Sequence, residues 1–125
     1  MTSTIARPAE LTDRVHEFYR LVDAGALDDL AAMFAQDAHY DRPGYPTLSG
    51  RAAIDHFYRH ERVIAAGQHR LDSVVVSGNE TAVRGSFDGV LRDGKPVRHR
   101  FAEFFVFTAD GLIGTRETFF AIAHV

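Results

Sequence analysis

The spacing of apolar residues changes near Gly67, and this change limits the folds open to the chain. Before it, apolar residues recur at helical spacing. One such series is Leu11, Val15, Phe18 and Val22. After it, apolar and polar residues alternate with the period of two that is typical of β-strands. Helices followed by a run of strands favour an α+β fold, with helices on one face of an antiparallel sheet.

The same patterns predict the individual elements. Three helices are expected: the series that ends at Gly25, a short helix over 27–35, and a third over 49–66 with Ser49 as its N-cap. A short strand is expected over 38–42, before the turn residues 43–46. Four strands then follow over 71–77, 82–91, 97–107 and 112–123, separated by Ser77-Gly78-Asn79, Asp93-Gly94 and Asp110-Gly111.

Length and composition exclude several classes of protein. The 125 residues suit one domain over 1–125, with a loose tail over 1–9. A net charge of −3 argues against a nucleic-acid binder, which would carry a basic patch. The absence of cysteine excludes disulfides, cysteine zinc sites and cysteine catalysis. The sequence shows no secretory signal and no apolar run of membrane-spanning length, so we expect a cytoplasmic protein.

The turn Asp93-Gly94 predicts which residues of two strands face each other. If it is a two-residue hairpin loop, Arg84 lies opposite Glu103, and Asp88 lies opposite His99. These four side chains would then share one face of the sheet, because alternate residues of a strand do. An Asp–His pair can orient a catalytic base, although near a hairpin tip it is also typical of an exposed surface pair.

A loop over 108–111 would place Arg116 opposite Glu103 and Phe120 opposite His99. One face of the strand 97–107 then reads His99, Phe101, Glu103, Phe105 and Phe107. A carboxylate among aromatic rings is costly unless it is paired. Two interpretations stay open: a structural ion pair with Arg84 or Arg116, or a polar group that projects into an apolar pocket.

The ten Phe and four Tyr residues indicate either a filled aromatic core or a cavity lined by aromatic rings. The charges on the same face as the Phe residues favour the cavity. His56 and His60 have the i, i+4 spacing of metal ligands, but the neighbouring Arg59 and Arg62 would repel a cation. We therefore expect no metal. The sequence has no phosphate-binding glycine loop and no dinucleotide fingerprint, so we expect no cofactor.

Several segments share a pattern with one known superfamily. They are Phe18-Tyr19-Arg20-Leu21-Val22-Asp23, Met33-Phe34-Ala35-Gln36-Asp37-Ala38, Asp41-Arg42-Pro43-Gly44-Tyr45-Pro46, Gly50-Arg51, Phe57-Tyr58-Arg59, Asp93-Gly94 and Asp110-Gly111-Leu112-Ile113. Over about residues 12–122 the chain resembles the SnoaL-like and ketosteroid isomerase-like branches of the nuclear transport factor 2-like superfamily. The resemblance implies a cone in which three helices cover a strongly curved mixed sheet around an apolar pocket. It also implies a small apolar or cyclic substrate and a homodimer formed through the outer sheet face.

The resemblance to ketosteroid isomerases implies a set of site residues. In those enzymes a carboxylate base removes a proton beside a carbonyl, and a Tyr and a protonated acid hold the enolate oxygen. The base matches Asp41, or Arg42 if the alignment shifts by one residue. The second acid matches Glu103, and a supporting Tyr matches Tyr58. An arginine beside Glu103 would keep it ionised and unable to donate a hydrogen bond.

The oxyanion Tyr of that family falls on Phe18, which has no hydroxyl group. Tyr19 follows it, but neighbouring helix residues point about 100° apart. We therefore do not expect a steroid isomerase. Arg116 or His99 could hold a developing oxyanion instead.

These points predict a small-molecule enzyme with Asp41 as general acid/base, which isomerises, cyclises or dehydrates an apolar carbonyl compound. The pocket would be lined by Phe18, Phe34, Tyr40, Tyr58, Phe101 and Phe120. One alternative is an epoxide hydrolase or epoxide-opening cyclase that uses Asp41 and Glu103 bridged by Arg84 or Arg116. Another is a ligand-binding or dimerising module without catalysis.

Overall fold

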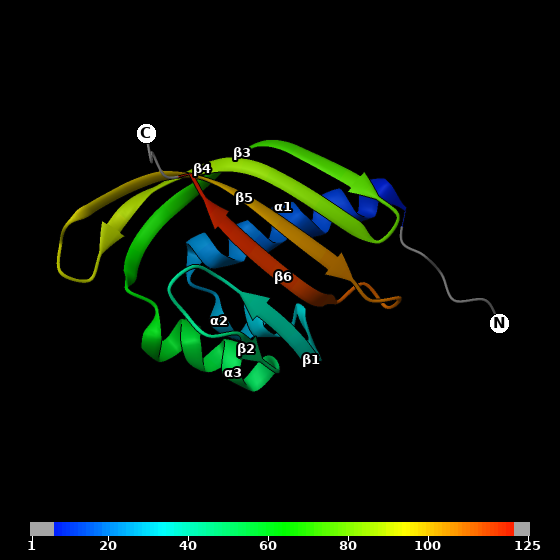
Figure 1. The fold of residues 1–125 in the computed structure, drawn as a ribbon, viewed down its shortest axis with the longest axis horizontal. Coiled ribbons are helices and arrows are strands. Elements are labelled where there is room, and N and C mark those ends of the chain that lie inside the picture. The colour runs from blue at the N-terminus through cyan, green and yellow to red at the C-terminus, as the bar shows by residue number, and fades with distance from the viewer. Residues whose placement is uncertain (1–6, 122–125) are drawn as a thin grey trace.

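The first apolar series forms the longest helix, α1, which spans Pro8–Ala24 in a computed structural model that describes residues 7–121 (Figure 1). Pro8 stands in the first turn, where its missing N–H removes no helical hydrogen bond. Gly25 ends the helix with a φ of 68°, which a glycine adopts without strain. Of the tail expected over 1–9, residues 1–6 lie outside the described residues, and Pro8 already belongs to α1.

The second and third helices are shorter than the sequence predicts. Helix α2 spans Leu27–Ala31, and the strand β1 then begins three residues later and runs over Phe34–Asp41. The expected third helix is divided into the strand β2 (Leu48–Ser49), the helix α3 (Arg51–His56) and a π-helical turn, η1 (Phe57–Glu61).

Two backbone features explain the shortened third helix. The Gly50 N–H donates to the Ala38 carbonyl at 2.7 Å, which ties the residues before it to β1. Gly50, and not Ser49, is therefore the N-cap. At the other end Arg62 is extended, with a ψ of 127°, and the strand β3 follows from Ile64 to Ser77.

Six strands form one mixed sheet in the order β2-β1-β6-β5-β4-β3. The remaining strands are β4 (Glu80–Leu91), β5 (Pro96–Phe107) and β6 (Ile113–Phe120). Strand β1 runs parallel to β6, and every other neighbouring pair is antiparallel. The predicted α+β class with a mixed sheet is confirmed. The expected end of the last strand, residues 122–123, lies outside the described residues.

The β4–β5 register differs by one residue from the prediction. Leu91 receives a hydrogen bond from Gly94 at 2.9 Å and donates one to Lys95 at 2.8 Å, so the loop has three residues rather than two. Gly94, with a φ of 89°, accommodates this turn. Glu103 therefore pairs with Val83, and Arg84 lies on the opposite face. The predicted Arg84–Glu103 pairing is wrong.

The same shift separates Asp88 from His99. Asp88 instead pairs with Arg98, and their side chains form an exposed ion pair at 3.0 Å. The β5–β6 register differs from the prediction by two residues: Phe107 pairs with Ile113 and not Leu112, and a bulge between Val106 and Phe107 adds the second residue. A shift of two leaves each side chain on its predicted face. Arg116 therefore stays on the face that carries Glu103.

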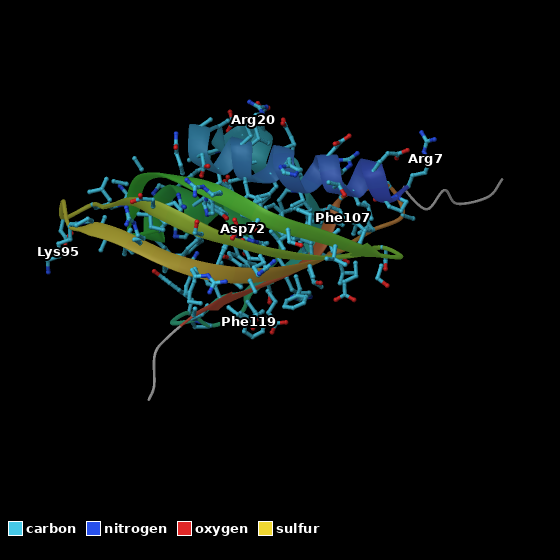
Figure 2. The ribbon with its side chains drawn as sticks, turned by 90° about the horizontal axis from the view of Figure 1, so that it is seen from above. Arg7, Arg20, Asp72, Lys95, Phe107 and Phe119 are labelled. Atoms are coloured by element: carbon cyan, nitrogen blue, oxygen red, sulfur yellow. The ribbon has the colours of Figure 1, made fainter. Side chains whose placement is uncertain are left out.

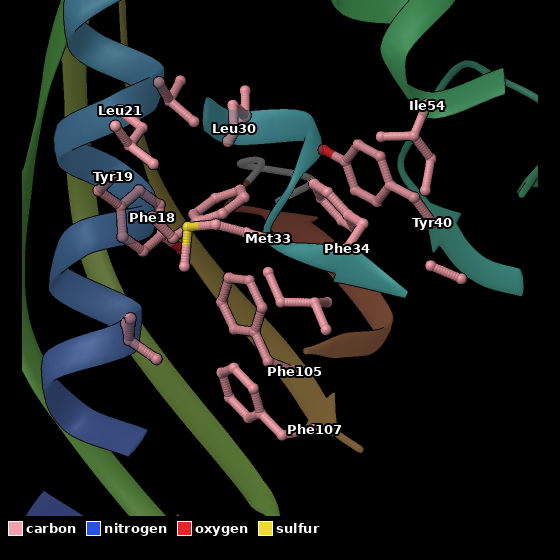
Figure 3. Packing of buried hydrophobic residues seen from close by; sticks show 14 of the residues in the cluster. Phe18, Tyr19, Leu21, Leu30, Met33, Phe34, Tyr40, Ile54, Phe105 and Phe107 are labelled. Atoms are coloured by element: carbon pink, nitrogen blue, oxygen red, sulfur yellow. The ribbon is translucent and has the colours of Figure 1, made fainter. Parts of the chain in front are cut away.

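The helices cover one face of the curved sheet, and the core lies between the two layers (Figures 1 and 2). The sheet is concave toward α1, and a glycine in β4 permits a close approach there: a Cβ atom at Gly85 would lie 2.2 Å from the Arg70 carbonyl oxygen. Phe18, Phe34, Phe105 and Phe107 fill the core and are at most 2% exposed (Figure 3). None of the described helices is both long and apolar enough to cross a membrane.

Candidate functional site

A buried ion pair lies at the centre of the concave face. Glu103 on β5 and Arg116 on β6 are 1% and 5% exposed. The Arg116 Nε donates to the Glu103 Oε2 at 2.7 Å. The guanidinium also stacks over the rings of Phe18 and Tyr40, at 4.5 Å and 4.2 Å from their centroids. Arg116 therefore neutralises the charge of Glu103. It is one of the two arginines that the sequence analysis considered as partners of Glu103.

Hydroxyl groups complete the environment of this pair. Tyr19 donates to the Glu103 Oε1, and Thr118 donates to the Oε2. Arg116 donates in turn to the Tyr58 hydroxyl at 2.6 Å. Both oxygens of Glu103 are thus occupied by donors from α1 and β6.

Electrostatics hold the pair in its charged form. Burial alone would raise the pKa of Glu103, but the charge of Arg116 and the hydrogen bonds from Arg116, Thr118 and Tyr19 outweigh it and lower the pKa. Burial, followed by the negative charge of Glu103, raises the pKa of Tyr19 well above 10.0, so its hydroxyl stays protonated. Glu103 is consequently an ionised acceptor at neutral pH and cannot donate to an oxyanion.

A small cavity opens beside this network, with a volume of about 20 Å³. This is room for about one water molecule. It is lined by Val22, Tyr40, Arg42, Tyr58, Arg62, Ile64, His69, Phe87, His99, Phe101, Glu103, Arg116, Thr118 and Phe120. The structure thus brings together seven of the residues that the sequence nominated: Glu103, Arg116, His99, Tyr40, Tyr58, Phe101 and Phe120.

Four nominated residues lie elsewhere. Asp41 is exposed and accepts a hydrogen bond from Thr47, because odd-numbered residues at the end of β1 face solvent. Arg84 lies on the opposite face of the sheet for the reason given above. Phe18 and Phe34 are fully buried in the core and do not reach the cavity.

Arg42 takes the inward position that the alternative alignment allowed for it. Its guanidinium donates to the Tyr40 hydroxyl at 3.1 Å and stacks against Phe57 at 5.1 Å and Phe120 at 5.7 Å. A cation, not a carboxylate, therefore occupies this end of the cavity.

His69, which lines the same cavity, is paired with Asp23, and the sequence did not reveal this Asp–His pair. The His69 Nδ1 and the Asp23 Oδ1 are 2.6 Å apart, and the His69 backbone N–H donates to the Asp23 Oδ2 at 2.8 Å. The two side chains are 11% and 22% exposed. Two bonds to one carboxylate fix the imidazole ring, which packs against Tyr19 and Phe87 with centroids 4.9 Å and 4.6 Å away.

His99, a residue of β5, also lines the cavity. Its ring packs on Phe120 with the centroids 4.4 Å apart, and its Nδ1 is buried without a described partner. Burial, and then the proximity of His69, lowers the pKa of His99 below 6.5. His99 is therefore neutral at pH 7.

Tyr19 corrects a prediction, since its side chain does reach the network. The buried face of α1 is wide enough to include both Phe18 and Tyr19 (Figure 3). The spacing Leu11, Val15, Tyr19 is i, i+4, i+8, and this second stripe was the signal that could have identified it. Arg62 and His69 gave no such signal. Arg62 lies near the end of the helix expected over 49–66, and His69 lies in the loop expected after it.

Among residues 7–121 no group of three or more His, Asp or Glu side chains is placed to hold a metal ion. His56 and His60 are exposed and lie against each other, with ring centroids 4.8 Å apart.

Comparisons with known proteins agree with this architecture. The solved structure of the epoxide hydrolase/cyclase-like enzyme SalBIII, described in pyran ring formation in the polyether salinomycin, has a TM-score of 0.80 and 20% identity. The match covers 91% of this chain and 92% of that one. A nuclear transport factor 2-like protein of unknown function from Burkholderia pseudomallei has a TM-score of 0.80 and 22% identity, with 97% and 92% covered.

A further protein of that description, from an Exiguobacterium species, has a TM-score of 0.77 and 22% identity, with 90% and 99% covered. These likenesses show the fold, and no curated protein sequence matches the chain significantly. The SnoaL-like domain model matches residues 15–114. The resemblance seen in the sequence is thereby confirmed, and the chain belongs to the SnoaL-like domain family.

Proposed function

We propose that this chain is a small-molecule enzyme that moves a proton at a carbon next to a carbonyl group, with His69 as the general base. The observation that carries the proposal is the Asp23–His69 pair, held at 2.6 Å on the border of the cavity. Isomerisation, cyclisation or dehydration of an apolar carbonyl compound are the reactions that such a step begins. The base assigned to Asp41 from the resemblance moves to His69, because Asp41 faces solvent.

Asp23 prepares His69 for this role. An ionised carboxylate only accepts hydrogen bonds, so the His69 Nδ1 carries a proton and donates the hydrogen bond to Asp23. In the neutral ring the Nε2 is then the unprotonated nitrogen, which can take a proton from a ligand. Asp23 also stabilises the imidazolium that forms when the ring is protonated, as in other Asp–His pairs.

Glu103 is unsuited to act as the base. Its two oxygens already accept from Tyr19, Thr118 and Arg116. We assign it the role of holding Arg116, which in turn donates to the Tyr58 hydroxyl. Tyr58 accepts this bond, and its own O–H donates to no described residue, so that proton is available to an oxyanion in the cavity.

The step follows from this arrangement. The His69 Nε2 takes the proton from the carbon, and the electron pair of the broken C–H bond moves into the enolate. The enolate oxygen accepts a hydrogen bond from Tyr58, whose contact with the Arg116 cation strengthens that donor. Return of the proton to another atom completes an isomerisation, whereas attack by the enolate carbon closes a ring.

The test measures the exchange of deuterium from D₂O into 2-tetralone, a flat apolar ketone with acidic protons beside its carbonyl. We expect the wild-type chain to accelerate exchange above the buffer rate, and His69→Asn and Asp23→Asn to lose about 10²-fold or more of that acceleration. Proton NMR measures the rate. The control is His16→Asn, which alters an exposed histidine of α1 outside the cavity.

Two results would contradict the proposal. One is a wild-type rate equal to that in buffer, which would favour a binding module without catalysis. The other is full exchange by His69→Asn. Thermal unfolding of each variant shows whether a lost rate reflects a lost fold.

Opening of an epoxide is a second candidate, favoured by the fold shared with the epoxide hydrolase/cyclase-like SalBIII. In this chain the carboxylate pair first expected for that chemistry is not assembled, since Glu103 alone among the described lining residues carries a carboxylate. The Asp23–His69 pair would then activate the attacking oxygen. Incorporation of ¹⁸O from labelled water into a diol product would identify this reaction.

We also propose a homodimer through the outer face of the sheet. Val75, Ala82 and Phe104 are successive cross-strand partners on β3, β4 and β5, and the Phe104 ring meets that of Phe119 at 5.9 Å. We call these four residues the outer apolar stripe. Three of them are exposed by 59%, 38% and 48% (Val75, Phe104 and Phe119), and large apolar patches of this kind are uncommon on monomers.

A further inference from the structure

Two arginines line the cavity without a counter-charge. Neither Arg42 nor Arg62 has a carboxylate within 4.0 Å among residues 7–121, whereas Arg116 is paired with Glu103 at 2.7 Å. Arg62 makes no described side-chain hydrogen bond, and its guanidinium lies 5.6 Å from the centroid of Tyr58. Guanidinium groups stay charged in proteins, so both positive charges persist.

The unpaired arginines are partly shielded from water, since both residues are half-buried. The Nε atoms of Arg42 and Arg62 are buried and have no hydrogen-bond partner within residues 7–121. Burial lowers the pKa of Arg62, and the like charges of Arg116 and Arg42 act in the same direction. A buried donor without an acceptor and a buried charge without a partner are both unfavourable in a folded protein.

The charges in the cavity do not balance. Three arginines and one glutamate line it, and His99 is neutral at pH 7. Asp23 lines the adjoining groove and not this cavity, and its carboxylate is engaged by the ring and backbone of His69. Among the residues that the structure describes, the lining therefore carries two positive charges that no carboxylate compensates, and these favour an anionic ligand.

A groove on the outer side of Arg62 has room for the rest of such a ligand. It has a volume of about 340 Å³, within the usual range for small-molecule sites of about 300–1,000 Å³. Val22, Tyr58, Arg62, Ile64 and Phe87 line both this groove and the inner cavity. Arg62 thus stands at the boundary, where it can meet an anion that enters from the groove.

We propose that the site takes an organic carboxylate, whose carboxylate group binds Arg62 and Arg42 while its apolar body lies in the outer groove. The inference deepens the proposed function, and it rests on that function for the view that the cavity admits a small molecule. The apolar lining from Val22, Ile64 and Phe87 favours an organic anion over a free inorganic one. Placed in this way, the ligand has its body beside Tyr58, which lines the groove, and its carboxylate in the cavity that His69 lines.

Direct binding tests the proposal without requiring turnover. The probes are 2-naphthoate and its neutral analogue 2-naphthamide, with inorganic phosphate as a competitor, and calorimetry measures Kd. We expect the wild-type chain to bind naphthoate and to bind naphthamide about 30-fold more weakly or worse. Arg62→Met and Arg42→Met should each weaken naphthoate by a similar factor and leave naphthamide unchanged.

Arg84→Met is the matched control, since Arg84 is exposed on the other face of the sheet. Arg62→Met and Arg42→Met should fold, because each removes an unpaired charge and keeps an unbranched apolar side chain; thermal unfolding verifies this. Equal affinity for the two probes, unchanged naphthoate affinity in both variants, or no naphthoate binding by the wild type would overturn the proposal. Displacement of naphthoate by phosphate at equal concentration would do so too, since the site would then recognise the anion without its body.

The binding result and the exchange result are independent. Loss of proton exchange in His69→Asn with naphthoate affinity retained would support both proposals. Naphthoate binding by a wild-type chain that shows no exchange would contradict the catalytic proposal and leave the carboxylate site supported.

Discussion

Glu103 keeps its charge in the protein interior because Tyr19, Thr118 and Arg116 all donate to it. The same bonds make Arg116 dependent on Glu103, since Arg116 is also buried. Removal of one partner of a buried pair leaves the other charge uncompensated, which commonly costs about 3–5 kcal/mol. We therefore expect Glu103→Gln to lower the free energy of unfolding by about that amount at pH 7, as measured by urea denaturation.

The pH dependence of this difference provides the check. The pKa of Glu103 is lower in the folded chain than its ordinary value of 4.5. The unfolded chain therefore takes up this proton first as the pH falls, so the stabilisation by Glu103 is complete above pH 4.5 and is lost at lower pH. The stability gap between wild type and Glu103→Gln should shrink below that pH. A gap that stays constant from pH 7 to acid would show that Glu103 is not ionised in the fold.

At the scale of elements, two glycines of β4, Gly85 and Gly89, permit a close approach to the backbone of β3. A Cβ atom at Gly85 would lie 2.2 Å from the Arg70 carbonyl oxygen and 3.0 Å from the Phe101 ring. The first contact is with backbone, which cannot rotate away. We expect Gly85→Ala to destabilise the chain by about 1–3 kcal/mol, as overpacked interiors do.

Gly114→Ala on β6 is the matched control, because its nearest contact would be 3.3 Å. Urea denaturation gives the free energy of unfolding of both variants for comparison. Equal stability of Gly85→Ala and Gly114→Ala would show that the close approach to β3 is not required. Gly85→Ala should also lower the rate of deuterium exchange into 2-tetralone, because the added Cβ atom would press on Phe101, which lines the cavity.

The elements also show which parts of the site the sequence could predict. Residues of one strand alternate in direction whatever the loop does, so His99, Phe101 and Glu103 could be placed on one face from β5 alone. Arg116 stayed on that face because the β5–β6 register differs by an even number. Arg84 did not, because Asp-Gly suits loops of two and of three residues, and one extra residue reverses the face.

Other parts of the site depend on contacts that no local pattern encodes. The segment from Ile64 to Gly67 contains two alanines, which favour a helix, but pairing with β4 makes it a strand. Arg62 and His69 flank that segment, so their positions could not be predicted. The Asp23–His69 pair joins residues 46 positions apart, and only the packing of α1 on β3 brings them together.

At the scale of the whole molecule, the two faces of the sheet differ in what covers them. The helices cover the concave face, while Phe119 points away from α1 on the other side (Figure 2). The aromatic residues divide accordingly: Phe18, Phe34, Phe105 and Phe107 fill the core, and Phe87, Phe101 and Phe120 border the cavity. Phe104 and Phe119 belong to neither group. Their position on the outer face is best explained by a partner of the same shape.

The outer apolar stripe therefore predicts self-association through a two-fold interface, in which the same patch faces its copy. We expect light scattering after size exclusion to give the mass of a dimer for the wild-type chain. The double variant Phe104→Glu with Phe119→Glu should give a monomer, since two like charges on each copy would face each other across the interface. Val63→Glu is the control, because Val63 is 53% exposed but precedes β3 and lies outside the stripe. A monomeric wild type, or a double variant that remains dimeric, would show that the stripe is not the interface.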